Sequence, residues 1–286
     1  MARLHDVTVY QMPQQSGPAA ARNYGARKAK GDIFFFVDSD VAVKKDSVAR
    51  IANVFRNNTD IAAVFGSYDD NPLEKNFVSQ YKNIFHHFIH QQSSEEAVTF
   101  WAGCGAIRSK VFHEMGGFNE KLYSIPSIED IELGSRMKRK RYRIWLDKKL
   151  QVKHLKKWNL FSLLSTDIFH RAIPWTRLML ENREIINDLN LQASQKISAS
   201  LVGLAMVILP FVFFELRLFY IVFILLGLVI ILNRKLYGFF LQRKGLKFTL
   251  MAFPLHLLYF LYSGITFVLC SLGVFLKRRG LSKPRL

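Results

Sequence analysis

Apolar residues are distributed unevenly along this chain of 286 residues. Residues 1–196 alternate short apolar runs with polar stretches, which is typical of a mixed α/β domain. Residues 197–276 are mostly apolar, and their long runs are Ile197–Phe214, Leu218–Leu232 and Phe248–Leu276. Because about 200 residues suffice for one α/β core, the pattern predicts one such domain followed by a membrane region.

The strongest local signal in the first part is the apolar run Ile33–Val37, which follows Gly31 and predicts a buried central strand. Similar patterns predict further strands at Val7–Met12, Ile61–Phe65, Val98–Trp101, Tyr142–Leu146 and Leu150–His154. Helices are predicted at Gly17–Ala29, Asp46–Asn57, Glu74–Gln92 and Ser109–Gly116, and from a capping-box-like start at Ser127.

Two carboxylates, Asp38 and Asp40, follow the strand Ile33–Val37 directly. At a strand's period of two they point the same way, and two like charges so close are costly unless something neutralises them. A divalent cation bound through oxygens would neutralise them and commonly also holds substrate phosphates. Ligands of open α/β sheets bind at the carboxyl ends of strands, where this pair lies. Because Asp also favours turns, a plain turn stays an alternative.

A second acidic group, made up of Glu129, Asp130 and Glu132, crowds the first turn of the helix predicted after Ser127. Acids there are stabilised by the helix dipole, so simple capping explains them. A carboxylate held at a helix start is also a good candidate proton acceptor. The pattern alone leaves both interpretations open.

Further candidates lie on the Ala-rich helix and in a glycine-containing stretch. Arg22 and Asn23 have either a structural or a phosphate-facing role on the helix predicted from Gly17. Gly103 and Gly105 suggest a close approach of the backbone to another group, and Cys104 between them is expected to be a packed thiol. With only Cys104 and Cys270, the chain has no disulfide framework, which indicates a reducing compartment.

Much of the net charge of +18 lies between Arg136 and Lys157, a segment that contains eleven Lys/Arg and a single acid, Asp147. A basic block beside membrane segments suggests an anionic lipid or a phosphate-bearing substrate. Nucleic acid is the competing partner, which the neighbouring apolar spans make weaker. Residues 1–6 lack the apolar core of a cleavable secretory signal.

The segment Asn159–Glu181 mixes apolar, aromatic and basic residues, which is typical of a helix lying in a membrane interface, and Pro174 is expected to kink or split it. The runs Ile197–Phe214 and Leu218–Leu232 are each slightly shorter than the roughly 20 residues of a span, so a tight hairpin is possible.

The last run, Phe248–Leu276, exceeds one span and is expected to tilt or to break near Pro254 or Gly264. The basic segments Asn233–Lys247 and Lys277–Arg285 should both lie inside, which three simple spans cannot achieve. The sequence leaves this topology unresolved.

Four motifs in order resemble those of family 2 glycosyltransferases of the GT-A fold: Gly17–Gly25, Asp38–Asp40, Gly116–Glu120 and Glu129–Gly134. The resemblance covers about residues 5–155 and implies an inverting transfer from a nucleotide-diphosphate sugar with Mg²⁺ or Mn²⁺ as cofactor. It implies an α/β fold with a GT-A-like (Rossmann-like) mixed sheet, incomplete at its N-terminus and followed by an interfacial helix and C-terminal transmembrane helices.

The resemblance also implies roles for individual residues. Asp38 and Asp40 would hold the metal and the donor, and Asp130, with Glu129 beside it, would be the general base. Arg22, Asn23, Gly103 and His154 would also contact the donor. The expected acceptor or membrane contacts are Lys156, Lys157, Trp158, Arg171, Trp175 and Arg177; the segment Arg171–Arg177 faintly resembles the arginine–tryptophan segment of processive members.

By this interpretation residues 1–157 form a partial catalytic domain, residues 158–196 amphipathic interfacial helices and residues 197–286 a transmembrane region. A first portion of about 70 residues, expected of a doubled βαβ unit, precedes the matching part in such domains and is absent here. We expect an integral protein of the plasma or inner membrane with a cytosolic catalytic domain and a lipid- or polyprenyl-linked acceptor. The alternative is an inactive truncated membrane protein that binds anionic lipid or a partner through Arg136–Lys157. A small transporter has little support, because intramembrane polar residues such as His256 form no evident pathway.

Overall fold

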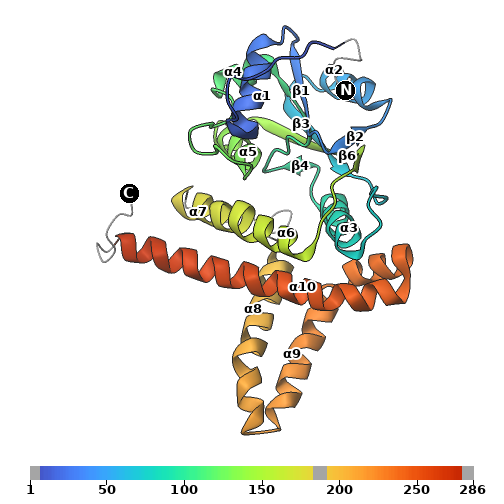
Figure 1. Cartoon of the computed structure of the whole chain (residues 1–286), viewed down its shortest axis with the longest axis vertical. Coiled ribbons are helices and arrows are strands. Elements are labelled where there is room, and N and C mark those ends of the chain that lie inside the picture. Colours follow the sequence, from blue (N-terminus) through green and yellow to red (C-terminus); the bar gives the residue numbers. More distant parts are fainter. Residues whose placement is uncertain (1–6, 183–191, 279–286) are drawn as a thin grey trace. The chain divides into compact units, whose positions relative to one another are not determined.

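The computed structural model describes residues 7–182 and 192–278, which form two compact units (Figure 1). The first unit contains the chain up to Ser39 together with Val43–Gly66 and Glu95–Leu150. The second contains Asp40–Ala42, Ser67–Ser94 and the chain from Gln151 onward. The chain therefore passes from one unit to the other between Ser39 and Asp40, inside the acidic motif.

The first unit is built on a β-sheet. Its strands are, in spatial order, β1 (Ile33–Val37), β5 (Cys104–Arg108), β3 (Ile61–Tyr68) and β6 (Arg143–His154), and the short β4 (Glu96–Ala97) also pairs with β6. Strand β5 is antiparallel to both of its neighbours, with Val37 opposite Cys104 and Phe65 opposite Gly105. This register brings the end of β1 beside the segment that precedes Cys104.

Helices α1 (Gly17–Lys28), α2 (Ser47–Asn57), α4 (Ser109–Glu114) and α5 (Glu129–Arg139) belong to the same unit. An aromatic cluster fixes β1, because Phe36 contacts the rings of Phe112 and Phe118 at centroid distances of 5.4 and 5.2 Å. Every residue of β3 is buried. The core therefore holds the carboxyl end of β1 in a defined position.

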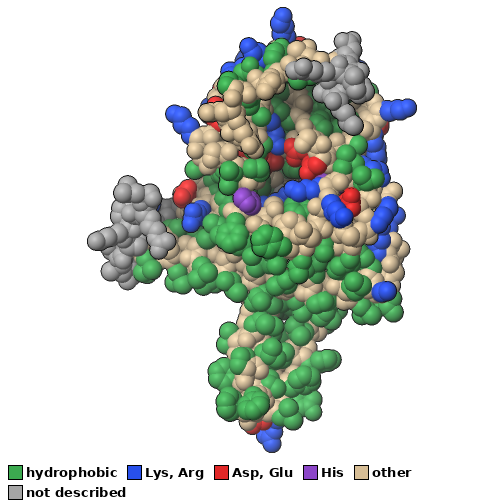
Figure 2. Space-filling model, in the orientation of Figure 1, with side chains coloured by type: hydrophobic (Ala, Val, Ile, Leu, Met, Phe, Trp, Pro, Cys, Tyr) green, Lys and Arg blue, Asp and Glu red, His purple; other side chains and the backbone are tan. Residues whose placement is uncertain are grey.

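The second unit is mostly helical. After α3 (Phe77–Gln92) it contains α6 (Leu160–Ser165), the π-helix η2 (Thr166–Ala172), α7 (Ile173–Asn182), α8 (Ala193–Ile208), the 3₁₀-helix η4 (Leu209–Phe213), α9 (Leu218–Leu232) and α10 (Arg234–Arg278). Strand β2 (Val41–Val43) lies beside β6, and Leu155 N donates a hydrogen bond of 2.8 Å to Asp40 O. Helices α8 and α9 form a hairpin whose surface is covered by hydrophobic side chains (Figure 2).

The core of the second unit joins α3 to α10. Its largest cluster contains aromatic and aliphatic side chains from α3, α6 and α10, together with Trp158: Tyr81, Ile84, Phe85, Ile89, Leu163, Leu236, Phe240, Ala252 and Leu255. Ser79 Oγ accepts a hydrogen bond of 2.7 Å from Trp158 N, which ties the segment before α6 to α3. Helix α10 is thus packed against the helices of its own unit along much of its length.

Most of the helices expected from the pattern are confirmed, but two predicted strands are wrong. Residues 7–12 have no regular structure, and Val7 and Val9 are exposed, because no strand pairs with them among the described residues. Residues 98–101 are a bend followed by irregular backbone, and after a turn at residues 102–103 the strand Cys104–Arg108 begins. Strand β1 is present, but in the described part of the chain it pairs with β5 alone and so lies at a sheet edge rather than in the centre.

Details at several helix ends also differ from the expectation. Asp46 precedes α2 without a side-chain capping hydrogen bond, and α5 begins after Ile128 with no capping box from Ser127. Ser127 N instead donates a hydrogen bond of 3.0 Å to Glu129 Oε2. The two strands predicted between Tyr142 and His154 form one continuous strand, β6. The predicted division at residues 157 and 196 stays a prediction.

One prediction for the membrane part is confirmed and one is wrong. The segment after Asn159 is divided next to Pro174, where a π-helix gives way to α7, because the proline ring would clash with an α-helical carbonyl in the preceding turn. The last apolar run does not break near Pro254 or Gly264, because the non-helical residue in α10 is Gly245, with φ 79°. A glycine adopts this φ at little cost.

Candidate functional site

One arginine connects the two acidic motifs of the first unit. Arg22 on α1 donates from Nη2 to Asp38 Oδ1 at 2.5 Å and from Nη1 to Glu129 Oε1 at 2.7 Å. Its side chain is only 15% exposed, so these bonds are poorly screened by water. Arg22 therefore holds Asp38 close to the start of α5, and its guanidinium is the positive charge that neutralises Asp38.

Arg22 stays charged in this position. Burial by itself would lower the pKa of its guanidinium, but the charges of Asp38, Asp130 and Glu129 outweigh burial and raise that pKa. A guanidinium also fits two carboxylates at once because of its planar fork of donors. The electrostatic role of Arg22 was not evident in the sequence, where it had only a structural or a phosphate-facing role on a helix.

Asp130 has a different environment from its two acidic neighbours. Its Oδ2 accepts a hydrogen bond of 3.0 Å from Ala102 N and its Oδ1 accepts one of 2.8 Å from Ile131 N. Burial first, and then the charge of Glu129, raise the pKa of Asp130 to about 6, although Arg22 and the Ala102 N–H oppose the rise. A carboxylate with such a pKa accepts a proton far better than an ordinary aspartate at neutral pH.

The segment Trp101–Gly103 connects Asp130 to the end of β1. Ala102 donates to Asp130, and Gly103 O accepts a hydrogen bond of 3.1 Å from Asp38 N. The Trp101 ring lies so close to Gly103 that a Cβ there would be 2.5 Å from ring atoms. The glycine pattern predicts a close approach at Gly103, but nothing in the sequence distinguishes Trp101, the last residue of the predicted strand, or Ala102, whose contribution is a backbone N–H.

Helix α5 reaches this segment because of a glycine. A Cβ on Gly134 would lie 2.3 Å from Phe100 N, so only glycine lets the helix approach the backbone of residues 99–100. This contact holds the first turn of α5, and Asp130 with it, against the segment that contains Ala102. The motif glycine at position 134 therefore has a packing role.

Asn23 differs from its predicted role. Its side chain is buried, its Nδ2 donates to Phe118 O at 2.8 Å, and its Oδ1 accepts from Phe118 N at 2.9 Å. The contacts of Asn23 in the described chain fix α1 to the segment that follows α4. The donor contact predicted for Asn23 is not among these interactions and stays a prediction.

Asp40 lies in the second unit, with His154 as its neighbour. The distance from His154 Nε2 to Asp40 Oδ2 is 3.9 Å, and the imidazole stacks on Tyr68 at a centroid distance of 4.1 Å. Burial, and then the charges of Lys156, Arg171 and Lys82, lower the pKa of His154 to about 4. At neutral pH this histidine is therefore uncharged, which is the form that binds metals.

The residues around Asp40 suit a divalent cation in part. In the described part of the chain no group of three His, Cys, Asp or Glu side chains is arranged to hold a metal. Asp40 and the neutral His154 supply two ligands of types that Mn²⁺ accepts, and substrate phosphates commonly complete such sites. The predicted role of Asp38 as a ligand stays a prediction, and its observed partner is Arg22.

The residues predicted to face an acceptor or the membrane fall into two classes. Trp158 is buried in the α3–α6–α10 core and carries Lys156 Nζ 4.2 Å above its ring centroid, so its contacts are internal. Lys157 and Arg177 are exposed, whereas Arg171 and Trp175 are half-buried on η2 and α7. Contact with a lipid or an acceptor stays a prediction for all six positions.

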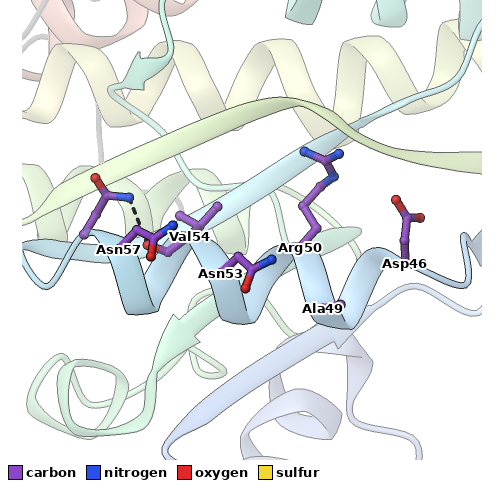
Figure 3. Close-up of a pocket in the computed structure, with 7 residues that line it drawn as sticks. Asp46, Ala49, Arg50, Asn53, Val54 and Asn57 are labelled. Atoms are coloured by element: carbon purple, nitrogen blue, oxygen red, sulfur yellow. Dashed lines mark hydrogen bonds between the residues drawn. The ribbon is translucent and has the colours of Figure 1, made fainter.

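A shallow pocket of about 350 Å³ lies along α2 (Figure 3). It is lined by short polar side chains and by Arg50, which pairs with Asp147 at 3.4 Å. None of the predicted site residues lines it. The chemistry therefore concentrates around Asp38, Glu129 and Asp130 rather than in this pocket.

Comparison with known proteins agrees with the motifs. Residues 1–116 match the model of the family described as glycosyl transferase family 2, so the resemblance is confirmed over that part of the chain. An uncharacterized glycosyltransferase of Haemophilus influenzae is 37% identical over 70 residues, which are 24% of this chain and 28% of that protein. The chain thus spans less than a third of the length of this relative.

Two solved structures are similar at 16–17% identity. One is a mannosyltransferase from Pyrobaculum calidifontis in complex with GDP-Man and Mn²⁺, with a TM-score of 0.42, covering 62% of this chain and 46% of the other. The second is S. aureus TarS 1-349 in complex with UDP-GlcNAc, with a TM-score of 0.42, covering 66% and 53%. At these TM-scores the likeness is too weak to establish a function.

Proposed function

We propose that the chain is an inverting glycosyltransferase that moves a sugar from a nucleotide-diphosphate sugar to a lipid-linked or membrane-proximal acceptor. One observation carries the proposal: Arg22 joins Asp38 to Glu129, beside an Asp130 whose pKa is raised to about 6. This arrangement places a predicted donor-binding carboxylate next to a predicted base. The family match over residues 1–116 supports the reaction class.

In the proposed reaction the carboxylate of Asp130 accepts the proton of the acceptor hydroxyl as that oxygen attacks the sugar. A single base on the acceptor side suffices for inversion, because no covalent intermediate is needed. The N–H groups of Ala102 and Ile131 hold both oxygens of Asp130 and so orient the base. The guanidinium of Arg22 neutralises the charges of Asp38 and Glu129. Asp130 is then the carboxylate that accepts the proton.

The donor's diphosphate needs positive charge as it leaves. A divalent cation held by Asp40 and His154 would stabilise that charge. The chain's own residues also contribute, because Lys82, Lys156 and Arg171 lie close enough to His154 to lower its pKa. Such a group of cations is suited to a diphosphate.

We place the reaction at the cytosolic face of a membrane. Two helices in the described chain, Ala193–Phe213 and Arg234–Lys277, are long and apolar enough to cross a bilayer. The non-enzymatic alternative, lipid or partner binding through Arg136–Lys157, is less favoured. Five cations of that block pair with acids, which reduces its free charge: Arg136, Lys138, Lys140, Arg143 and Lys153.

The test separates binding from turnover in the full chain. Thermal shift with UDP or GDP and Mn²⁺ would report donor binding, and release of nucleoside diphosphate from a panel of UDP- and GDP-sugars would report turnover. We expect Asp40→Ala to lose the nucleotide shift, and Asp130→Ala to keep it while turnover disappears. If both variants lose binding, or if both retain turnover, these roles are wrong.

A further inference from the structure

The α8–η4–α9 hairpin has the surface of a membrane insert. Its exposed side chains are aromatic and aliphatic, with Phe213 90%, Phe214 84% and Phe223 70% exposed. Apart from Lys196 near the start of α8, the charges on the hairpin lie at its tip (Figure 2), where Glu215 pairs with Arg217 at 3.8 Å. A charged tip is costly in hydrocarbon, so it favours a position among the headgroups of the far leaflet.

At the end of the hairpin opposite its tip, polar side chains join the start of α8 to the end of α9. Asn233, at the end of α9, donates to Ser198 Oγ at 2.9 Å and accepts from Gln195 Nε2 at 3.0 Å. The hairpin therefore returns to the level at which it began. Helix α10 starts there, at Arg234.

At the centre of its apolar run, α10 is hydrogen-bonded to a buried ion pair between Lys82 on α3 and Asp167 on η2. Tyr262 is the middle residue of Phe248–Leu276, and its hydroxyl donates to Asp167 Oδ2 at 2.8 Å. Lys82 Nζ contacts both oxygens of the same carboxylate, at 2.6 and 2.7 Å. If α10 crossed the bilayer, Tyr262 would lie near its midplane and would draw Lys82 and Asp167 there. Charged side chains at that depth are expensive.

The opposite side of α10 carries an apolar stripe that is exposed toward both ends of the run and covered by the hairpin in the middle, where Leu257 and Leu261 pack. Leu250, Ile265, Leu269 and Leu272 are 64%, 50%, 62% and 52% exposed, at spacings that keep them on one face of a helix. The helix runs across the base of the hairpin (Figure 1), where Phe260 packs with Val202 and Val229. One face of α10 is thus covered by α3, α6 and η2, and the other exposes apolar side chains on both sides of its contact with the hairpin.

We infer that α10 does not span the membrane but lies in its plane, with this stripe in the acyl chains of one leaflet, while α8–η4–α9 alone penetrates the bilayer. The occupant of the stripe is an anionic phospholipid leaflet, because basic residues flank the helix at both ends: Arg234, Lys235, Arg243, Lys244, Lys247 and Lys277. This topology puts both basic segments on one side, as the positive-inside rule requires and three simple spans do not allow.

The inference rests on the proposed membrane location, so the experiment tests membrane binding and the orientation of α10 by separate measurements. The full chain with Cys270→Ser would be reconstituted in phosphatidylcholine–phosphatidylglycerol vesicles, and flotation would test the membrane location by itself. Cys104 is buried in the first unit and can stay. Nitroxide labels at Leu250→Cys, Ile265→Cys and Leu272→Cys would then report depth from their accessibility to oxygen and to a water-soluble nickel chelate.

An in-plane α10 gives the same shallow depth at the three sites, to within about one helix turn, ~5 Å. A spanning α10 places Ile265 deeper than the other two sites by roughly 10 Å or more, and this result would overturn the inference. Labels at Tyr220→Cys, Ile224→Cys and Leu228→Cys on α9 are the control, with depth changing by about 6 Å per step. Terminal tags in sealed vesicles give a second measurement, because an in-plane α10 leaves both tags on the same side and a spanning one separates them.

Discussion

Two carboxylates, one in each unit, lie near cations, yet their pKa values shift in opposite directions; Asp130 is half-buried and Asp167 is buried. Asp130 lies beside Arg22, yet its pKa rises to about 6, mainly because of burial and Glu129. Burial also acts to raise the pKa of Asp167, but the charges of Lys82 and Arg171 and the hydrogen bonds from Lys82 and Tyr262 lower it below its usual value. Burial is common to both, so it does not decide which carboxylate is reactive.

The pKa values of Asp167 and Asp130 differ because a cation bonds directly to the first carboxylate and not to the second in the described structure. Lys82 contacts both oxygens of Asp167, whereas Arg22 uses its fork on Asp38 and Glu129. Among the described residues, the direct hydrogen bonds to Asp130 come from neutral backbone N–H groups, which stabilise a carboxylate less than an ammonium does. We therefore expect Asp167 to contribute to stability and Asp130 to act in the proposed reaction, and the predictions below test both expectations.

The largest expected effect is that of Asp130→Asn on turnover. Loss of a general base costs about 10²–10⁴-fold in rate, so kcat should fall by that range while the thermal shift with UDP or GDP persists. The melting temperature at pH 7 should not fall, because an aspartate with a raised pKa opposes folding when ionised. A variant that melts much earlier would place Asp130 with Asp167 as a structural acid.

Asp167→Asn, in contrast, should lower the free energy of unfolding. Removing one partner of a buried ion pair leaves Lys82 uncompensated and costs about 3–5 kcal/mol, which thermal melts in detergent would detect. The double variant Lys82→Met/Asp167→Leu should recover most of the loss, because no charge is then stranded. The exposed pair of Asp60 with Arg143 supplies the control, and Asp60→Asn should leave the melt unchanged.

The pH dependence provides a test without mutation. Because Asp130 acts in its ionised form, turnover should fall about tenfold per pH unit below 6 and level off above it. Its raised pKa contributes stability that is present below the ordinary aspartate value and is lost as pH rises toward 6. For Asp167 the effect on stability is the opposite, because its pKa is lowered. Its contribution to the free energy of unfolding is present above the ordinary aspartate pKa and is lost as pH falls through its own lower pKa. A rate profile that is flat between pH 5 and 8 would exclude Asp130 as the base.

Local sequence pattern was sufficient for most helices and for the strand before Asp38. These elements depend on periodicity, glycine and proline, all of which lie close together in the chain. The acidic motifs were found for the same reason. The strand predicted at Val7–Met12 was wrong because a strand needs a partner, and local pattern does not supply one.

The pairings that give the carboxylates their character could not be predicted. Arg22 lies 107 residues from Glu129, and Lys82 lies 85 residues from Asp167. Neither separation leaves a periodic signal, and both cations look like ordinary helix-surface residues in the sequence. The role of Ala102 is carried by a backbone N–H, which every residue except proline possesses.

The smallest expected effect tests whether that backbone N–H tunes Asp130. In Gly103→Ala the new Cβ would lie 2.5 Å from the Trp101 ring, so the ring or the segment must move. Because Ala102 is the neighbouring residue, its bond to Asp130 should weaken. That bond lowers the pKa of Asp130, so the midpoint of the rate profile should move above 6, by a few tenths of a pH unit.

Gly25→Ala is the matched control, because a Cβ at Gly25 on α1 meets nothing within 4 Å. It should leave the midpoint where it is and stabilise the helix slightly. A Gly103→Ala variant with reduced kcat and an unchanged midpoint would show that the segment acts on substrate placement instead. A downward shift would mean that the ionised form of Asp130 gained a hydrogen bond or a nearby cation, because both lower its pKa.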